Sequence, residues 1–251
     1  EERLRRQVLA PERHLAAFDL ENTLIASNVV ASYAWLGSRR LRGRDRVRFV
    51  AGLVAEAPTL LSLDRKDRSD FLRYFYRRYE GAPVDQIAHD ALEKFSELIL
   101  AKSFPAAIRR VREHRALGHH TVLITGALDF VVEPFRPLFD HIVSAELGVV
   151  EGTYDGRLTA VPPTGEARYQ ALVDHADEHG LDLRESVAYA DSASDLPMLE
   201  AVGFPVAVNP ETRLAGIARK RGWLVEDFRK SPGMHRNSLP LAPALHSDTS
   251  R

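Results

Sequence analysis

Four short apolar runs, each ending where polar residues begin, constrain the fold of this chain more than any other feature. The runs cover residues 14–18, 121–125, 186–190 and 204–208, and they are followed by Asp19, Gly126, Asp191 and Asn209. Apolar runs of this length, bounded by turn-forming residues, are typical of strands that are buried on both faces. The chain is therefore predicted to contain a sheet without a solvent-exposed face.

Helical patterns lie between the later runs. They cover residues 105–117, 165–179 and 195–202, and each is followed by a glycine that favours a helix end. Strands that alternate with helices of this length form a parallel sheet covered by helices on both faces. The expected fold is therefore α/β, with a Rossmann-like parallel sheet core.

The stretch from residue 27 to residue 103 has a different pattern, with long helical periodicities and no convincing buried strand. Residues 84–100 carry an apolar stripe of helical period, and residues 68–79 interleave aromatic side chains with arginines. We expect residues 1–26 and 104–228 to form the α/β core and residues 27–103 to form an inserted all-helical cap. Beyond Phe228 the composition turns to Ser, Pro, His and Lys, which predicts a flexible tail over residues 229–251.

Composition excludes several classes of protein. The 251 residues include no Cys, so disulfide scaffolds, thiolate zinc sites and cysteine nucleophiles are ruled out. Basic and acidic side chains number 34 and 35, giving a formal net charge of −1, which argues against a nucleic-acid partner. No apolar run approaches the roughly 18 residues of a membrane span. The start of the chain lacks the apolar stretch of a signal peptide, so a cytoplasmic location is expected, with the oligomeric state open.

The histidines and the common nucleophile motifs do not indicate a site. The ten His residues are scattered, and His119-His120 precedes a predicted strand without the i, i+4 helical spacing of a zinc site. The Gly-Xaa-Ser-Xaa-Gly pattern and the P-loop pattern are both absent.

Acidic and hydroxyl residues do gather at the predicted strand ends. Asp19 and Glu21 follow the first strand, Thr125 ends the second, and Asp191 and Asp195 follow the third. The carboxyl ends of parallel strands share one edge of the sheet, where ligands bind. Clustered carboxylates repel one another unless a cation lies between them, and oxygen-only ligation suits Mg²⁺. Such a site allows an Asp carboxylate to attack phosphorus and the aspartyl-phosphate to be hydrolysed.

Four motifs in order resemble those of the haloacid dehalogenase (HAD) superfamily, in its phosphoserine-phosphatase-like branch. They are residues 18–24 (FDLENTL), 124–126 (ITG), 165–168 (GEAR) and 189–199 (YADSASDLPML), and the resemblance covers about residues 14–228. It implies an Asp19 nucleophile and a metal shell of Asp19, the Glu21 carbonyl, Asp191 and Asp195, the last of which would orient metal-bound water or the basic motif residue. It also implies that Thr125, Gly126 and Arg168 hold the phosphoryl group.

Two residues depart from the pattern of that superfamily. Glu21 stands where its hydrolases usually have the Asp that serves as general acid and base, so that the carboxyl either works from one methylene further out or only caps the adjoining helix. Arg168 stands where a Lys is usual, and a planar guanidinium is not equivalent to an ammonium. If Arg168 were only a first-turn helix residue, Lys102, Lys220 or another residue would have to supply the positive charge.

Substrate recognition has weaker signals. Asn28 occupies the position where phosphoserine phosphatases carry an acidic residue for the substrate amino group, which argues against phosphoserine. Two arginine clusters are candidates for binding an anionic substrate, although each is also typical of a solvated helix face: Arg73, Arg77 and Arg78, and Arg39, Arg40 and Arg42.

The function expected from these observations is a Mg²⁺-dependent phosphatase that hydrolyses a small phosphomonoester through an aspartyl-phosphate on Asp19. The alternative is a catalytically weak or inactive phosphate-binding or regulatory domain of a larger protein, which Glu21 and Arg168 would favour. A third hypothesis is phosphoryl transfer to an acceptor other than water.

Overall fold

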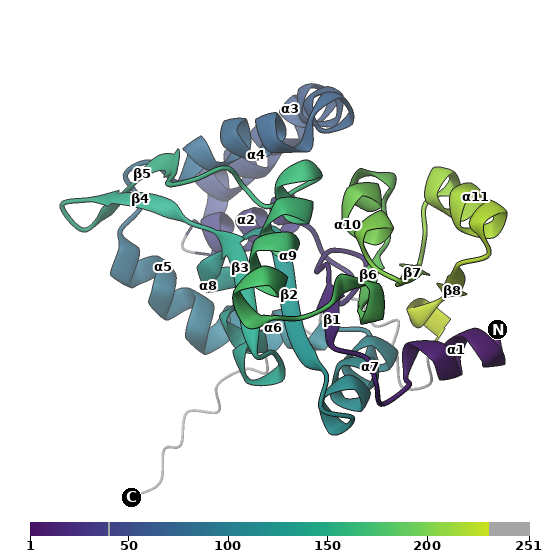
Figure 1. Cartoon of the computed structure of the whole chain (residues 1–251). Helices are drawn as coiled ribbons and strands as arrows, with labels where there is room; N and C mark the ends of the chain where they lie inside the picture. The colour runs from purple at the N-terminus through teal and green to yellow at the C-terminus, as the bar shows by residue number, and fades with distance from the viewer. Residues whose placement is uncertain (40, 231–251) are drawn as a thin grey trace, which may run out of the picture.

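A six-stranded parallel sheet forms the centre of the molecule (Figure 1). The computed structural model describes residues 1–39 and 41–230. The strand order is β3-β2-β1-β6-β7-β8, and every neighbouring pair is parallel. The strands are β1 (Leu15–Phe18), β2 (His120–Leu128), β3 (His141–Ala145), β6 (Val187–Ala190), β7 (Phe204–Val208) and β8 (Leu224–Glu226). The four predicted strands are β1, β2, β6 and β7, which confirms the predicted sheet.

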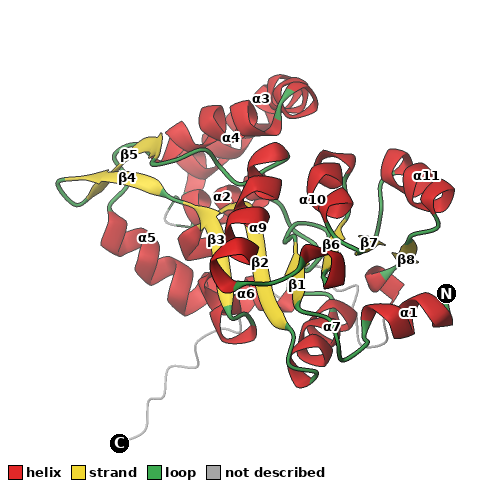
Figure 2. Cartoon of the chain, viewed as in Figure 1, coloured by secondary structure: helices red, strands yellow, loops and turns green. Residues whose placement is uncertain are grey.

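Helices cover both faces of this sheet (Figure 2). Alternate residues of β1 point to opposite faces, because the side-chain period of a strand is two. Ala16 and Phe18 belong to one apolar cluster with Val111, whereas Leu15 and Ala17 belong to another. The first face is covered by α1 (Glu2–Val8) and α7 (Pro105–Ala116), and the second by α9 (Glu166–His179), α10 (Leu196–Ala201) and α11 (Thr212–Arg221). The predicted α/β architecture is therefore confirmed.

The segment between β1 and α7 is helical. Asp67 is the N-cap of helix α4 (Arg68–Tyr76), since its side chain accepts a hydrogen bond of 2.9 Å from the Asp70 N–H. Neither residues 27–39 nor residues 41–103 contain a strand. The elements are α2 (Val29–Ser38), α3 (Gly43–Lys66), α4 (Arg68–Tyr76), the 3₁₀ turn η1 (Arg77–Tyr79), α5 (Val84–Asp90), the π-helical turn η2 (Ala91–Phe95) and α6 (Ser96–Ala101).

A two-stranded antiparallel hairpin lies outside the main sheet. It consists of β4 (Leu147–Val150) and β5 (Thr153–Leu158), and it contacts α4 and η1. The Gly81 N–H donates to the Tyr154 carbonyl at 2.8 Å, which links the helical segment to the hairpin. The remaining short helical elements are α8 (Asp129–Val132), η3 (Glu133–Leu138), η4 (Leu183–Glu185), η5 (Ala193–Asp195) and η6 (Phe228–Lys230).

Two predictions concern the periphery of the chain. The predicted tail begins at residue 229, and its residues 231–251 lie outside the described part of the structure. Across residues 1–39 and 41–230, no helix is both long and apolar enough to cross a bilayer.

A buried histidine makes the stability of this core depend on pH. His114 in α7 places Nε2 2.7 Å from the Tyr189 hydroxyl and Nδ1 2.7 Å from Nδ1 of His119. Burial, with smaller effects of His119 and Arg110, lowers the pKa of His114 to about 2. The unfolded chain, with an imidazole pKa of about 6.5, therefore binds a proton over a range in which the folded chain does not. The free energy of unfolding should therefore fall as the pH falls below about 6.5.

Proton binding by His114 in the unfolded chain should lower the free energy of unfolding by about 2 kcal/mol between pH 6.5 and pH 5, at about 1.4 kcal/mol per pH unit. Urea unfolding of the wild type and of His114→Gln, each at pH 8 and pH 5, measures the difference. The variant should lose less stability on acidification, whereas His89→Gln, at an exposed position, should behave as the wild type. An equal loss in the wild type and in His114→Gln would contradict the assignment.

Candidate active site

The loop after β1 presents Asp19 and Glu21 from a tight turn. The Asp19 N–H continues the strand pairing by donating to the Tyr189 carbonyl at 3.0 Å, which aligns the ends of β1 and β6. Beyond it, the Asn22 N–H donates to the Ile25 carbonyl at 2.8 Å, and Asn22 has a φ of +53°. An Asn tolerates this left-handed conformation better than most residues. The turn therefore holds both acidic side chains at the carboxyl edge of the sheet.

Three carboxylates gather at this edge. One carboxylate oxygen from each of Asp19, Asp191 and Asp195 lies within 4.8 Å of the other two. They meet because β1 and β6 are neighbours, with Asp191 directly after β6 and Asp195 in η5. Burial, reinforced by the charge of Asp19, raises the pKa of Asp191 to about 8. Burial also raises the pKa of Asp195 to about 7, against the opposing effect of Arg168. Such a donor set fits a hard divalent cation.

Arg168 is buried against two of these carboxylates. Its Nη2 lies 2.8 Å from the Asp19 Oδ1, and its Nη1 donates a hydrogen bond to the Asp195 Oδ1. The Nε donates to the Pro163 carbonyl at 3.3 Å. Gly165, with a φ of +53°, turns the chain into α9 and so brings Arg168 to the site from the first turn of that helix. Arg168 is therefore not an ordinary solvated helix residue.

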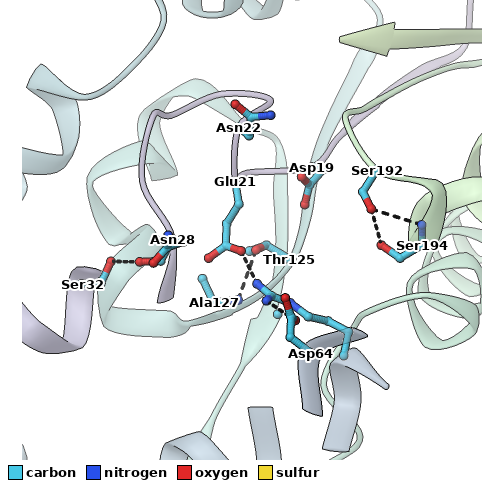
Figure 3. Close-up of polar contacts among 12 residues, drawn as sticks. Asp19, Glu21, Asn22, Asn28, Ser32, Asp64, Thr125, Ala127, Ser192 and Ser194 are labelled. Atoms are coloured by element: carbon cyan, nitrogen blue, oxygen red, sulfur yellow. Dashed lines mark hydrogen bonds and ion pairs between the residues drawn. The ribbon is translucent and has the colours of Figure 1, made fainter. Parts of the chain in front are cut away.

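Thr125 and Gly126 lie on the last part of β2, where its register with β3 shifts. The Thr125 Oγ1 accepts a hydrogen bond of 3.1 Å from the Ala127 N–H (Figure 3). A Cβ on Gly126 would come within 2.6 Å of Leu72 and 2.8 Å of Thr164. The Gly126 carbonyl accepts from the Tyr76 hydroxyl at 2.8 Å. The glycine thus allows α4 to approach the strand end closely.

Glu21 forms an ion pair with Arg68, a contact that the sequence does not predict. The Arg68 guanidinium contacts the Glu21 carboxylate and also binds Asp64 Oδ1 at 2.6 Å (Figure 3). Because Arg68 begins α4, the pair joins the helical segment to the loop after β1. Burial raises the pKa of Glu21, and Arg68 opposes that effect. The i, i+4 spacing of Asp64 and Arg68 is a sequence signal for their pairing, but it does not indicate Glu21.

The arginines that were candidates for substrate binding lie elsewhere. Arg73 pairs with Asp70 at 3.3 Å, and Arg78 pairs with Glu56. Arg39 pairs with Asp90 at 3.3 Å. Arg40 lies outside the described residues. Among the described members of the two clusters, none lines the cleft that contains Asp19; the cleft instead receives Arg65, Arg68 and Arg213.

Two asparagines support the acidic edge, and neither was predicted. The Asn22 Nδ2 donates to the Asp191 Oδ2 at 2.8 Å. The Asn209 Nδ2 donates to the Asn22 carbonyl at 2.6 Å, and its Oδ1 accepts from the Phe228 N–H at 2.8 Å. Asn209 has a φ of +45°. These contacts connect the loops after β1, β6 and β7 to the end of β8.

One cleft of about 890 Å³ collects the predicted residues. It lies between the carboxyl edge of the sheet and the α3–α4 region. Asn28 also lines it, with its Oδ1 accepting from the Ala31 N–H at 2.9 Å as the N-cap of α2. Lys102 and Lys220 are not among the lining residues. All seven predicted residues line this cleft: Asp19, Glu21, Thr125, Gly126, Arg168, Asp191 and Asp195.

A family comparison agrees with this geometry. The sequence profile of the haloacid dehalogenase-like hydrolases matches residues 16–200, a span that contains all seven predicted site residues. The chain belongs to this family. The resemblance inferred from the four motifs is thereby confirmed, and the order of the motifs in this HAD hydrolase corresponds to the order in which β1, β2, α9 and β6 deliver their residues to the cleft.

The curated relatives of this chain include named phosphatases. Phosphoserine phosphatase SerB1 of Mycobacterium tuberculosis is 30% identical over 240 residues, covering 92% of this chain and 76% of the relative. A histidinol-phosphatase of Neisseria meningitidis is 28% identical over 241 residues, covering 86% of this chain and all of the relative (100%). The expected reaction class, phosphoric monoester hydrolysis, is confirmed at this coarse level.

Solved structures share the fold of the HAD hydrolase. A Bordetella pertussis protein of unknown function has a TM-score of 0.75 and 27% identity, covering 86% of this chain and 99% of that chain. A phosphoserine phosphatase in its apo form has a TM-score of 0.62 and 19% identity, covering 86% of this chain and 96% of that chain. At that lower identity the second likeness concerns the fold alone.

Proposed function

We propose that the chain is a Mg²⁺-dependent phosphatase that hydrolyses a small phosphomonoester through an aspartyl-phosphate on Asp19. The observation that carries the proposal is the position of Asp19, which faces the cleft between Arg168 and the other carboxylates. Family membership supports the reaction class, and the cleft supports a small substrate. The helices of residues 27–103, which contribute Asp64 and Arg68 to the cleft, serve as its cap in this proposal.

The proposed metal ligands are the carboxylates of Asp19, Asp191 and Asp195, together with the Glu21 carbonyl. Their fit to a cation rests on the clustering of the carboxylate oxygens. It also rests on the cost of burying several carboxylates, since Arg168 is the arginine that pairs with them among the described residues. When bound, Mg²⁺ neutralises charge on the carboxylates and on the phosphoryl oxygens.

In the first step, an Asp19 oxygen attacks phosphorus, and the bond from phosphorus to the leaving oxygen breaks. The leaving oxygen takes a proton from the Glu21 carboxyl, while Thr125, the backbone near Gly126 and Arg168 hold the phosphoryl oxygens. In the second step, water attacks phosphorus and gives a proton to Glu21. The bond from phosphorus to Asp19 then breaks, which releases phosphate and restores the carboxylate.

The substrate is proposed to be a phosphomonoester other than phosphoserine. Asn28, which lines the cleft, carries no charge with which to bind an ammonium group, and its side-chain oxygen already caps α2. Besides Arg168, the arginines that line the cleft are Arg65, Arg68 and Arg213.

Phosphate release from a broad panel of phosphomonoesters tests this function. The full chain should turn over at least one compound in the presence of Mg²⁺, and chelation with EDTA should stop the reaction. Phosphoserine and histidinol phosphate belong in the panel, because two relatives are named as phosphatases of these compounds. Absence of turnover on the whole panel would contradict the proposal.

The alternative function, a phosphate-binding or regulatory domain with little hydrolysis, is favoured by one observation. Glu21 is held by Arg68, and this ion pair would have to loosen or shift for the carboxyl to exchange a proton with the leaving group. In that alternative, the same cleft binds phosphate without efficient turnover.

Substitutions of Glu21 separate the two functions. Glu21→Gln should lower kcat by about 10²-fold to 10⁴-fold, because a carboxamide cannot replace a general acid and base. Glu21→Asp should not raise kcat if the site is arranged for the longer side chain. A large gain in kcat for Glu21→Asp would instead show that the native site is not tuned for hydrolysis. Glu133→Gln, at a surface ion pair with Arg136, is the matched control and should retain full activity.

A further inference from the structure

A group of histidines lies at the edge of the sheet opposite the carboxylates. His120 is the first residue of β2, and His141 is the first residue of β3. His175 and His179 lie on the last turns of α9, one helical turn apart. One ring nitrogen from each of His120, His175 and His179 lies within 4.8 Å of the other two. We call these three residues the histidine cluster. The sequence interpretation of the histidines as scattered was therefore wrong, since His175 and His179 have i, i+4 spacing.

Hydrogen bonds determine which nitrogen of His179 has a free lone pair. Its Nδ1 lies 2.9 Å from the carbonyl oxygen of His175. Because a carbonyl can only accept, Nδ1 carries the proton and Nε2 keeps its lone pair. A metal-binding histidine usually has this arrangement, in which the other ring nitrogen donates to a carbonyl or a carboxylate.

The other two rings already face each other through their Nε2 atoms, which are 2.9 Å apart. Tetrahedral Zn²⁺ with Zn–N bonds of about 2.0–2.1 Å requires neighbouring nitrogens about 3.3 Å apart. Small movements of the His120 and His175 rings would therefore bring these two nitrogens to that separation. His179 is exposed and His120 is half-buried, so an ion can reach the cluster from solvent.

One more imidazole ring and one carboxylate adjoin the histidine cluster. The ring of His141 stacks on that of His175, with 4.5 Å between centroids. The Asp140 carboxylate accepts hydrogen bonds of 2.8 Å from the N–H and the Oγ1 of Thr121, and its charge acts on His120.

We propose that the histidine cluster binds one Zn²⁺ ion through the imidazoles of His120, His175 and His179, with water or His141 in the fourth position. Imidazole ligands favour borderline transition metals, whereas the carboxylate cluster favours Mg²⁺. This site is separate from the proposed active site, because it lies at the amino ends of β2 and β3 and at the far end of α9 from Arg168.

Zinc titration of the metal-free full chain, in buffer with excess Mg²⁺, tests the proposal. The wild type should bind one equivalent of Zn²⁺, and X-ray absorption should give a nitrogen shell at about 2.0–2.1 Å. His120→Gln and His179→Gln should each weaken this binding on the order of 100-fold or more, since loss of even an outer-shell partner costs about 10-fold to 100-fold. Circular dichroism verifies that both variants remain folded.

Two control variants locate the site. His89→Gln, at an exposed position on α5, and the double variant His235→Gln/His246→Gln should both retain wild-type binding. The proposal is overturned if the wild type binds no Zn²⁺ in the presence of Mg²⁺, if the cluster variants bind as tightly as the wild type, or if only the double variant loses the ion.

Discussion

Replacing Asp19 by Asn should abolish phosphomonoester hydrolysis by this chain. The amide is nearly isosteric with the carboxylate, but it is a poor nucleophile and carries no charge to bind the cation. Losing a covalent nucleophile costs a factor on the order of 10⁴ or more in kcat. The measurement is kcat on the best substrate of the panel. Acid-quenched protein analysed by mass spectrometry should also carry a phosphoryl adduct in the wild type and not in the variant.

The matched control is Asp182→Asn, at an exposed ion pair with Arg184. This variant should keep wild-type kcat and the adduct. Hydrolysis that persists in Asp19→Asn at a tenth of the wild-type rate or more would show that another group attacks phosphorus, and the proposed mechanism would be wrong.

Replacing Arg168 by Ala should destabilise the fold as well as stop the reaction. The guanidinium is buried between Asp19 and Asp195, and its removal leaves both carboxylates buried without their close cation. Breaking a buried ion pair in this way typically costs about 3–5 kcal/mol. Protonation of the two carboxylates relieves part of this cost. The decrease in the free energy of unfolding caused by Arg168→Ala should therefore be smaller at lower pH. Urea unfolding at pH 8 and pH 5 measures both effects.

Two further measurements test whether the buried ion pairs of Arg168 cause this loss of stability. Mg²⁺ should raise the unfolding midpoint of Arg168→Ala more than that of the wild type, because it restores positive charge among the carboxylates. Arg168→Lys should recover part of the stability, whereas Arg184→Ala, on the surface, should leave the midpoint unchanged. If Arg168→Ala unfolds at the wild-type midpoint, the buried ion pairs do not have the role assigned to them.

The centre of the fold could be predicted because its strands are buried on both faces. Residues of β1, β6 and β7 form continuous apolar runs, which periodicity identifies directly. The edge strands are a different case. β8 has three residues, and β3 begins with an exposed histidine, so neither contains a buried run long enough to recognise. The β4–β5 hairpin depends on a turn at Glu151 and Gly152, whose positive φ values are not apparent from apolar periodicity.

In the site, positions after strands and the four motifs indicate the predicted residues, including Arg168 from α9, but they do not indicate Arg68. Asp19, Thr125 and Asp191 were predicted from their positions at strand ends. Arg68 looks like any charged residue at the start of a helix, and its contact with Glu21 depends on how α4 packs against the core. A helix period cannot specify that packing. The histidine cluster was missed for a related reason, since the packing of α9 against the beginning of β2 brings its three residues together.

The contacts and backbone conformation of Asn209 restrict which residue types can replace it. Its side chain donates at one end and accepts at the other, and its backbone adopts a left-handed conformation. Asp offers no donor, Ser offers a shorter side chain, and a β-branched residue is strained at this φ. Because Asn22, its partner, binds Asp191, a substitution at residue 209 reaches a proposed metal ligand through two hydrogen bonds. We therefore expect evolution to have kept Asn at this position even though the residue lies outside the chemistry.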